Sequence, residues 1–100
     1  MKNKSFQPLH PGEILEEEFL APMAISQSKL ARDLDVSHRR INEIALGKRS
    51  ITPDTAMRLS QYLGTTAEFW MNLQTTYDLR ILLRTKNSVY KKLPHMAKAA

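Results

Sequence analysis

The sequence predicts an all-α fold of about five helices. Apolar residues recur at spacings of three and four, and residues that favour helix ends occur at short intervals. No segment shows the alternation of apolar and polar residues that is typical of a β-strand. One hundred residues, of which 42% are apolar, are enough for a single domain with one modest hydrophobic core.

Two helices are expected in the first third of the chain. The first should cover residues 11–20, because Pro11 suits the first helical position, where its missing amide hydrogen has no partner. Pro22 should end this helix. The second helix should begin at the N-cap Ser26 and run to about Asp33.

The next two helices have equally clear limits in the sequence. The third should begin at the N-cap Ser37 and close at Gly47, since glycine suits the left-handed position after a helix. The fourth should have Thr52 as its cap, Pro53 as its first residue and Gly64 as its terminator.

The fifth helix should start at the capping box Thr65-Thr66-Ala67-Glu68. Apolar residues then occupy nearly every side of this helix, which is more than one small core can cover. A second copy of the chain is the expected cover, which makes this a C-terminal dimerisation helix. The predicted dimerisation residues are Trp70, Tyr77, Leu79, Leu82 and Leu83, of which Trp70 could instead belong to the core.

Charge and composition narrow the class of protein. The net charge is +5, and basic residues gather in residues 26–50 and 84–100, which suits a surface that faces a polyanion. The absence of cysteine excludes disulfides and thiolate zinc sites. With no apolar run of membrane-spanning length and no secretory signal in the sequence, a cytoplasmic location is expected.

Residues 26–46 have the features of a helix-turn-helix, two short helices joined by a turn of three or four residues. Ala31 is small where the two helices must cross, and Val36 is the apolar residue that fills the turn. Ile41 and Ile44 would hold the second helix against the core. The alternative is an ordinary helical hairpin with solvated arginines.

This segment resembles the phage-repressor-like (Xre-type) helix-turn-helix family. The motifs HPGEIL at 10–15, GKRSITP at 47–53 and EFWMNLQ at 68–74 resemble those of the HigA/VapI-type antitoxins more closely, so that the resemblance covers roughly residues 9–84. One departure is Asp35, at a turn position where the family usually has glycine. Aspartate tolerates the left-handed backbone well, so the turn should survive at small cost.

The resemblance implies a five-helix phage-repressor-like fold and a homodimer joined partly through the last helix. It also implies two further partners, a palindromic operator in the protein's own promoter and a HigB-type toxin, an mRNA-cleaving ribonuclease that the antitoxin holds inactive. The corresponding domain boundaries are a flexible segment over residues 1–8, the folded domain over 9–84, and a basic, flexible tail over 85–100.

Carried over onto this sequence, the resemblance places the start of the third helix in the DNA major groove. Arg39 should then form two parallel hydrogen bonds to guanine, worth about 1–3 kcal/mol of discrimination. Gln27 should meet the phosphate backbone at the start of the second helix. The predicted DNA-binding residues are Gln27, Ser37, His38, Arg39, Arg40, Asn42, Lys48 and Arg49.

Several of these residues have a second interpretation. His38 could contact a base or a phosphate, or be exposed without a role, and Asn42 could pair with adenine or be merely solvated. Arg40 could reach a phosphate or lie across its own helix. The glutamates at 16–18 are expected to form a solvated face, because successive helical positions diverge and cannot converge on one metal ion. No metal or cofactor is expected.

The function that these features favour is a sequence-specific repressor that is also an antitoxin. A free-standing phage-type repressor with no toxin partner is the alternative, and an adaptor that has lost DNA binding is disfavoured by Arg39 and Arg40. An enzyme is not expected. The three histidines form no H-E-x-x-H pattern, and the sequence has neither a glycine-rich phosphate loop nor a nucleophile elbow.

Overall fold

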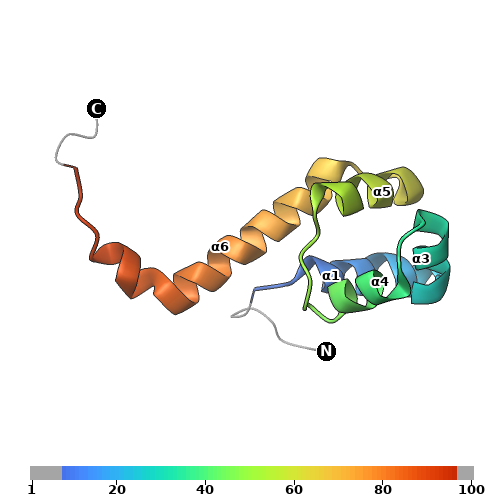
Figure 1. The fold of residues 1–100 in the computed structure, drawn as a ribbon, viewed down its shortest axis with the longest axis horizontal. Helices are drawn as coiled ribbons and strands as arrows, with labels where there is room; N and C mark the ends of the chain where they lie inside the picture. Colours follow the sequence, from blue (N-terminus) through green and yellow to red (C-terminus); the bar gives the residue numbers. More distant parts are fainter. Residues whose placement is uncertain (1–7, 97–100) are drawn as a thin grey trace.

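Helices pack around one core, and the last of them extends away from it as an arm (Figure 1). The structure is a computed structural model that describes residues 8–96, and it contains helices and turns but no strand within that range. The predicted all-α, five-helix fold is confirmed. Among the described residues, none of the helices has the length and apolar character that crossing a bilayer requires.

The first helix is one continuous rod made of three segments. They are α1 (Pro11–Ile14), the π-helix η1 (Leu15–Leu20) and α2 (Ala21–Met23). The prediction that Pro22 ends this helix is wrong, because the helix continues through it to Met23. In the π segment the Ala21 amide donates to the Glu16 carbonyl, five residues back. This wider turn relieves the clash that a proline ring meets with the carbonyl four residues back in an α-helix.

The two helices of the predicted helix-turn-helix form as expected. They are α3 (Gln27–Leu34) and α4 (His38–Ala45). The Ser26 hydroxyl caps α3 by accepting from the Lys29 amide at 3.0 Å, and the Ser37 hydroxyl caps α4 by accepting from the Arg40 amide at 3.0 Å. Both predicted N-caps are therefore confirmed.

Three helix ends share one backbone motif. Ala24, Asp35 and Gly47 have left-handed φ values of 55°, 59° and 77° and follow the first helix, α3 and α4 respectively. In each case the amides at and just after this residue donate back into the last turn, which is the Schellman arrangement. The expected left-handed Asp35 is confirmed, and so is Gly47 as the residue that closes the predicted third helix.

The last two helices are α5 (Pro53–Leu63) and α6 (Ala67–Lys91). Thr52 caps α5 and Gly64 ends it with φ 80°, as predicted. The predicted capping box of α6 is displaced by one residue, because the Thr66 hydroxyl accepts from the Phe69 amide. The Thr65 hydroxyl instead accepts from the indole Nε1 of Trp70 at 2.7 Å, since a buried indole needs a hydrogen-bond partner.

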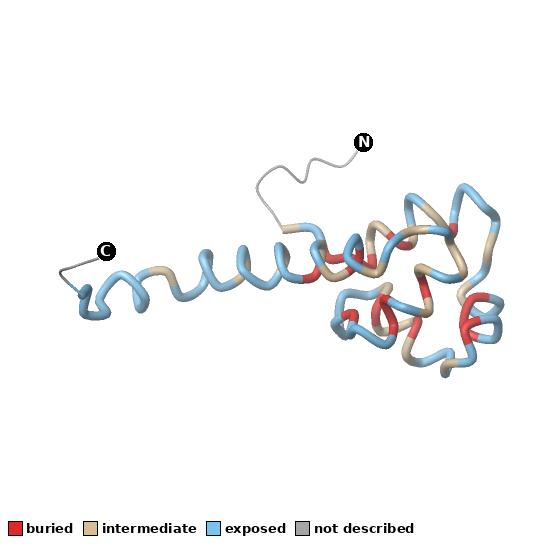
Figure 2. The backbone as a smooth tube through the Cα atoms, turned by 90° about the horizontal axis from the view of Figure 1, so that it is seen from above, coloured by how far each residue is buried: buried red, intermediate tan, exposed pale blue. Residues whose placement is uncertain are grey.

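Helix α6 has 25 residues, so it is about 37 Å long. The predicted tail over 85–100 is therefore helical as far as Lys91, and residues 97–100 lie outside the described residues. The predicted flexible segment over 1–8 also lies outside them, except for Pro8. Buried residues are concentrated at the core end of the molecule, and the far part of α6 is exposed (Figure 2).

The core takes residues from every helix except α2. Its fully buried members include Leu15, Leu30, Ile41, Ile44, Ala56, Leu59 and Trp70. Trp70 has 0% of its surface exposed within a single chain, so the prediction that it forms a dimer contact is wrong. Phe19 and Phe69 pack against its ring at centroid distances of 5.3 and 5.0 Å and leave no face for a second chain.

The first helix approaches α4 closely at Gly12. A Cβ atom at this position would lie 1.8 Å from the Ile44 carbonyl oxygen, which no side chain can tolerate. Glycine therefore lets the backbones of the two helices touch. The start of the first helix is thereby packed directly against the end of α4.

His10 caps the same helix from a buried position. Its Nδ1 accepts from the Gly12 amide at 2.9 Å, and its ring meets Tyr77 of α6 edge to face at 4.9 Å. Burial lowers the pKa of His10, outweighing the nearby charges of Asp78 and Glu13. A neutral imidazole is what this cap requires, because protonation of Nδ1 would remove the acceptor.

We expect Gly12→Ala to lower the free energy of unfolding by about 1–3 kcal/mol, since the added methyl group must push the two helices apart. Helix propensity alone predicts the opposite, a gain of about 1 kcal/mol. Urea unfolding followed by circular dichroism measures the difference. Gly64→Ala is the control, because its Cβ would meet nothing within 4 Å and its cost comes only from the positive φ. A Gly12→Ala variant as stable as wild type would contradict the close approach.

We expect the protein to lose stability on acidification from about pH 7.5 to about pH 5.5, partly because of His10. The unfolded state takes up this proton below about pH 6.5, whereas the lowered pKa delays uptake in the folded state. His10→Asn retains a capping acceptor but cannot titrate, so its stability should fall less over this range. Unfolding measured at both pH values, with exposed His38→Asn as the control, tests this. Equal pH dependence in wild type and His10→Asn would contradict it.

Candidate nucleic-acid interface

Helix α4 has one face in the core and one in solvent. Ile41 and Ile44 are fully buried, whereas His38 and Arg39, at the start of the helix, are exposed. Helix α3 packs against α4 across the turn at Asp35. This geometry leaves the N-terminal turn of α4 free to enter a groove, as in a helix-turn-helix that binds DNA.

Arg39 is the most prominent cation on this face. Its side chain is 83% exposed, and its Nε donates to Oε2 of Glu43 at 2.8 Å, one helical turn later. This bond raises the pKa of Arg39, and hydrogen bonds from Arg39 and Arg49 lower the pKa of Glu43. Arg39 is therefore a permanent cation on an exposed surface, as its predicted role requires.

Glu43 also binds the loop that follows α4. Its Oε1 accepts from Nη2 of Arg49 at 2.7 Å and from Nε at 2.9 Å. The structure thus brings two predicted DNA-binding residues, Arg39 and Arg49, to one carboxylate. Sequence reasoning missed Glu43, although its i,i+4 spacing from Arg39 was a usable signal.

Two other predicted residues touch across the helix-turn-helix. The Asn42 side-chain amide donates to Oε1 of Gln27 at 3.1 Å. Gln27 is the first residue of α3 and Asn42 lies in α4, so this bond ties the predicted phosphate-binding end of α3 to the predicted base-reading helix. Both side chains are partly buried, which restricts the directions they can take.

Arg40 crosses to α5 rather than along its own helix. Its Nη1 donates to Oδ2 of Asp54 at 3.2 Å and lies 3.4 Å from the Thr55 hydroxyl. A contact from Arg40 to a DNA phosphate would have to share the guanidinium with this ion pair or open it. The hydroxyl of Ser37, also a predicted DNA-binding residue, is engaged as the N-cap of α4.

The remaining predicted residues, His38 and Lys48, are exposed at the two ends of α4 and its following loop. Leu46, at the C-cap of α4, is exposed as well and was not predicted. An apolar side chain on such a surface can contact the methyl group of thymine. The sequence did indicate its exposure, because Leu46 lies two residues after Ile44 and so does not continue the spacing of three or four that marks the buried face.

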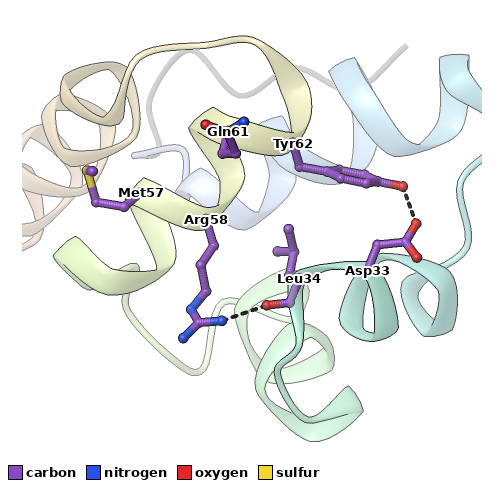
Figure 3. A pocket seen from close by; sticks show the side chains of 6 residues that line it. All are labelled: Asp33, Leu34, Met57, Arg58, Gln61 and Tyr62. Atoms are coloured by element: carbon purple, nitrogen blue, oxygen red, sulfur yellow. Dashed lines mark hydrogen bonds between the residues drawn. The ribbon is translucent and has the colours of Figure 1, made fainter.

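Arg58 of α5 binds the C-terminal end of α3, the first helix of the helix-turn-helix (Figure 3). Its Nη1 donates to the carbonyl of Leu34 at 2.7 Å, at the end of α3, and its Nε donates to Asp54 at 2.9 Å. The Tyr62 hydroxyl donates to Asp33 nearby, at 2.5 Å. A groove between α3 and α5 lies beside these contacts. It is lined by Asp33, Leu34, Met57, Arg58, Gln61 and Tyr62.

Gln74 holds the C-terminal end of the loop that follows α4, called here the basic loop because it carries Lys48 and Arg49. Its side chain is buried, its Oε1 accepts from the Ile51 amide at 2.8 Å, and its Nε2 donates to Asp78 at 3.0 Å. The loop that carries Lys48 and Arg49 is thereby attached to α6. The sequence signal was a glutamine four residues after Trp70, on the same helical face.

The predicted glutamate face is partly solvated. Glu17 and Glu18 are exposed, and Glu16 is only half-buried. Within residues 8–96, no group of three or more histidine, aspartate or glutamate side chains is arranged to hold a metal ion.

Comparison with known proteins identifies the family. Residues 17–70 match the family model described as helix-turn-helix. Virulence-associated protein I of Dichelobacter nodosus is 50% identical over 86 residues, which cover 86% of this chain and 80% of that protein. Antitoxin HigA-1 of Vibrio cholerae is 35% identical over 79 residues, which cover 79% of this chain and 74% of that protein.

Solved structures agree with the sequence relatives. The structure of Pseudomonas aeruginosa antitoxin HigA with the higBA promoter has a TM-score of 0.88 and 40% identity, covering 92% of this chain and all of that one. The structure of antitoxin GraA in complex with its operator has a TM-score of 0.85 and 39% identity, covering 98% and 99% of the two chains. The chain therefore belongs to the Xre-type helix-turn-helix family, and within it to the HigA/VapI-type antitoxins.

Proposed function

We propose that this protein is a sequence-specific DNA-binding repressor of its own operon and the antitoxin of a HigB-type ribonuclease. The observation that carries the proposal is the exposed Arg39 at the start of α4, on a helix whose opposite face is buried in the core. The similarity to HigA and GraA, whose structures contain promoter or operator DNA, supports it. The proposed role is binding rather than catalysis, in the cytoplasm, where bacterial DNA lies.

The proposed complex places α4 in the major groove. Arg39 would donate to guanine, and His38 beside it would face a base or a phosphate. The amides at the start of α3, next to Gln27, would meet a phosphate, because a helix N-terminus attracts anions. Lys48 and Arg49 would contact the backbone on the other side of the groove.

A homodimer is the proposed assembly, because α6 carries apolar residues that the single chain does not cover. Leu79, Leu82 and Leu83 are 57%, 38% and 58% exposed on the arm of α6, and Tyr77 is partly exposed at its base. Pairing of two arms would bury these side chains. It would also present two α4 helices to half-sites of a palindrome about 34–36 Å apart.

The toxin partner is proposed from the family, since several of the relatives are antitoxins. A free-standing repressor is the alternative, and the fold cannot separate the two because they share it. The discriminating observation is the neighbouring gene. A small basic protein encoded next to this one, whose ribonuclease activity is lost when this protein is added, would support the antitoxin role.

We expect the protein to bind the DNA upstream of its own gene about 10³-fold more tightly than a scrambled duplex. Arg39→Ala should lower this preference by a factor of about 5–150, the equivalent of 1–3 kcal/mol, because one base contact is lost. Lys48→Ala is the matched control. As a phosphate contact it should weaken binding to both duplexes alike and reduce the slope of log affinity against log salt by about one.

Fluorescence anisotropy over a salt series provides these measurements. Equal affinity of the wild-type protein for both duplexes would contradict the repressor role. An Arg39→Ala protein that loses affinity equally for both duplexes would show instead that Arg39 contacts phosphate.

We expect Leu82→Asp with Leu83→Asp to make the protein monomeric at concentrations where the wild type is a dimer, because the charges would have to be buried. Operator affinity should fall by about 10²-fold or more, since the two half-sites would be bound independently. Sedimentation velocity and anisotropy measure both effects. Thr75→Asp with Ser88→Asp, which adds the same two charges at exposed polar positions of α6, is the control. A wild-type protein that stays monomeric when concentrated would contradict the dimer.

A further inference from the structure

We propose that Glu43 is a positioning residue that sets DNA specificity by holding Arg39 for base contact and by suppressing binding to phosphates. This inference rests on the proposed function, and it concerns a residue that lies among the predicted DNA contacts without being a cation. Glu43 is the only acidic residue of α4. An acidic side chain on a surface that faces a polyanion opposes binding, so its position calls for a physical reason.

The two oxygens of Glu43 have separate partners. Oε2 accepts from Nε of Arg39 at 2.8 Å, and Oε1 accepts from Nη2 of Arg49 at 2.7 Å. The Glu43 side chain is 25% exposed, far less than the 83% of Arg39. A less exposed carboxylate therefore holds a highly exposed guanidinium on the groove-facing side of α4.

The bond to Arg39 selects one part of its guanidinium. Because Glu43 binds Nε, the two terminal nitrogens of Arg39 remain at the tip as a parallel pair of donors. This is the pair that a bidentate contact to O6 and N7 of guanine can use. Tethering also reduces the rotamer freedom that Arg39 must lose on binding, which favours base contact through preorganisation.

The negative charge of Glu43, in contrast, disfavours contacts between this surface and DNA phosphates. It compensates one of the two arginine charges and competes with DNA phosphates for Arg49, the loop cation that the proposed function places at the backbone. Binding to DNA of any sequence depends mainly on such backbone contacts. Glu43 should therefore weaken nonspecific binding while it leaves the donors of Arg39 available, and both effects raise specificity.

Glu43→Gln in the full-length protein tests this inference, with affinity measured on the upstream duplex and on its scrambled counterpart. The variant should bind the scrambled duplex about fivefold more tightly at about 0.15 M salt, which is the effect of one additional phosphate contact. The upstream duplex should gain less, so the ratio of the two affinities should fall. Glu18→Gln, the same charge change at an exposed site on the first helix, should leave that ratio unchanged.

The same substitution in an Arg39→Ala background separates positioning from direct readout. If Glu43 acts through Arg39, then Glu43→Gln should raise affinity for both duplexes alike in this background and should not change their ratio further. An equal fall of the ratio in both backgrounds would overturn the inference, because Glu43 would then itself accept a hydrogen bond from a base such as cytosine.

Two other outcomes are also decisive. A Glu43→Gln protein that keeps the wild-type ratio would overturn the role of Glu43 and leave the proposed repressor function intact. A wild-type protein without preference for the upstream duplex would overturn both. Circular dichroism should report wild-type helicity for Glu43→Gln, since the bonds that it weakens lie on the exposed surface.

Discussion

The contact on which the rest of the structure depends is the approach of the first helix to α4 at Gly12. Because no side chain separates Gly12 from the Ile44 carbonyl, the two helices meet backbone to backbone. His10 completes this junction. Its ring caps the first helix, lies 3.7 Å from the position of a Cβ on Gly47, and packs on Tyr77. One short segment thus fixes the C-terminal end of α4, its basic loop and α6 relative to one another.

A second set of contacts holds α4 from the side of α5. Asp54 accepts from both Arg40 and Arg58, and Arg58 also caps the carbonyl of Leu34 at the end of α3. Exposed ion pairs of this kind contribute little to stability individually. Their effect here is geometric, because they link both helices of the helix-turn-helix to one neighbour. A groove-binding helix needs such support, since base contacts demand accurate placement of its side chains.

Local chemistry was sufficient to predict most helix limits and the turn at Asp35, because caps and left-handed residues act on their own neighbours. Features decided by tertiary packing were not predictable in this way. Thr66 caps α6 because its neighbour is taken by the indole of Trp70, and that indole is buried inside one chain. The candidate site shows the same limit. Its cations were visible in the sequence, but the convergence of Glu43 with Arg49 depends on how the loop folds.

Helix α6 links the core that supports α4 to the exposed leucines of the proposed dimer interface. Its first half is fixed in the core by Trp70 and by Gln74, whose side chain holds the amide of Ile51 at the end of the basic loop. Its second half carries the exposed leucines. Because the exposed leucines follow Trp70 and Gln74 within one continuous helix, pairing of two arms would set the distance and angle between two α4 helices. The spacing of operator half-sites would then follow from α6 packing within each chain, and not only from contacts between chains.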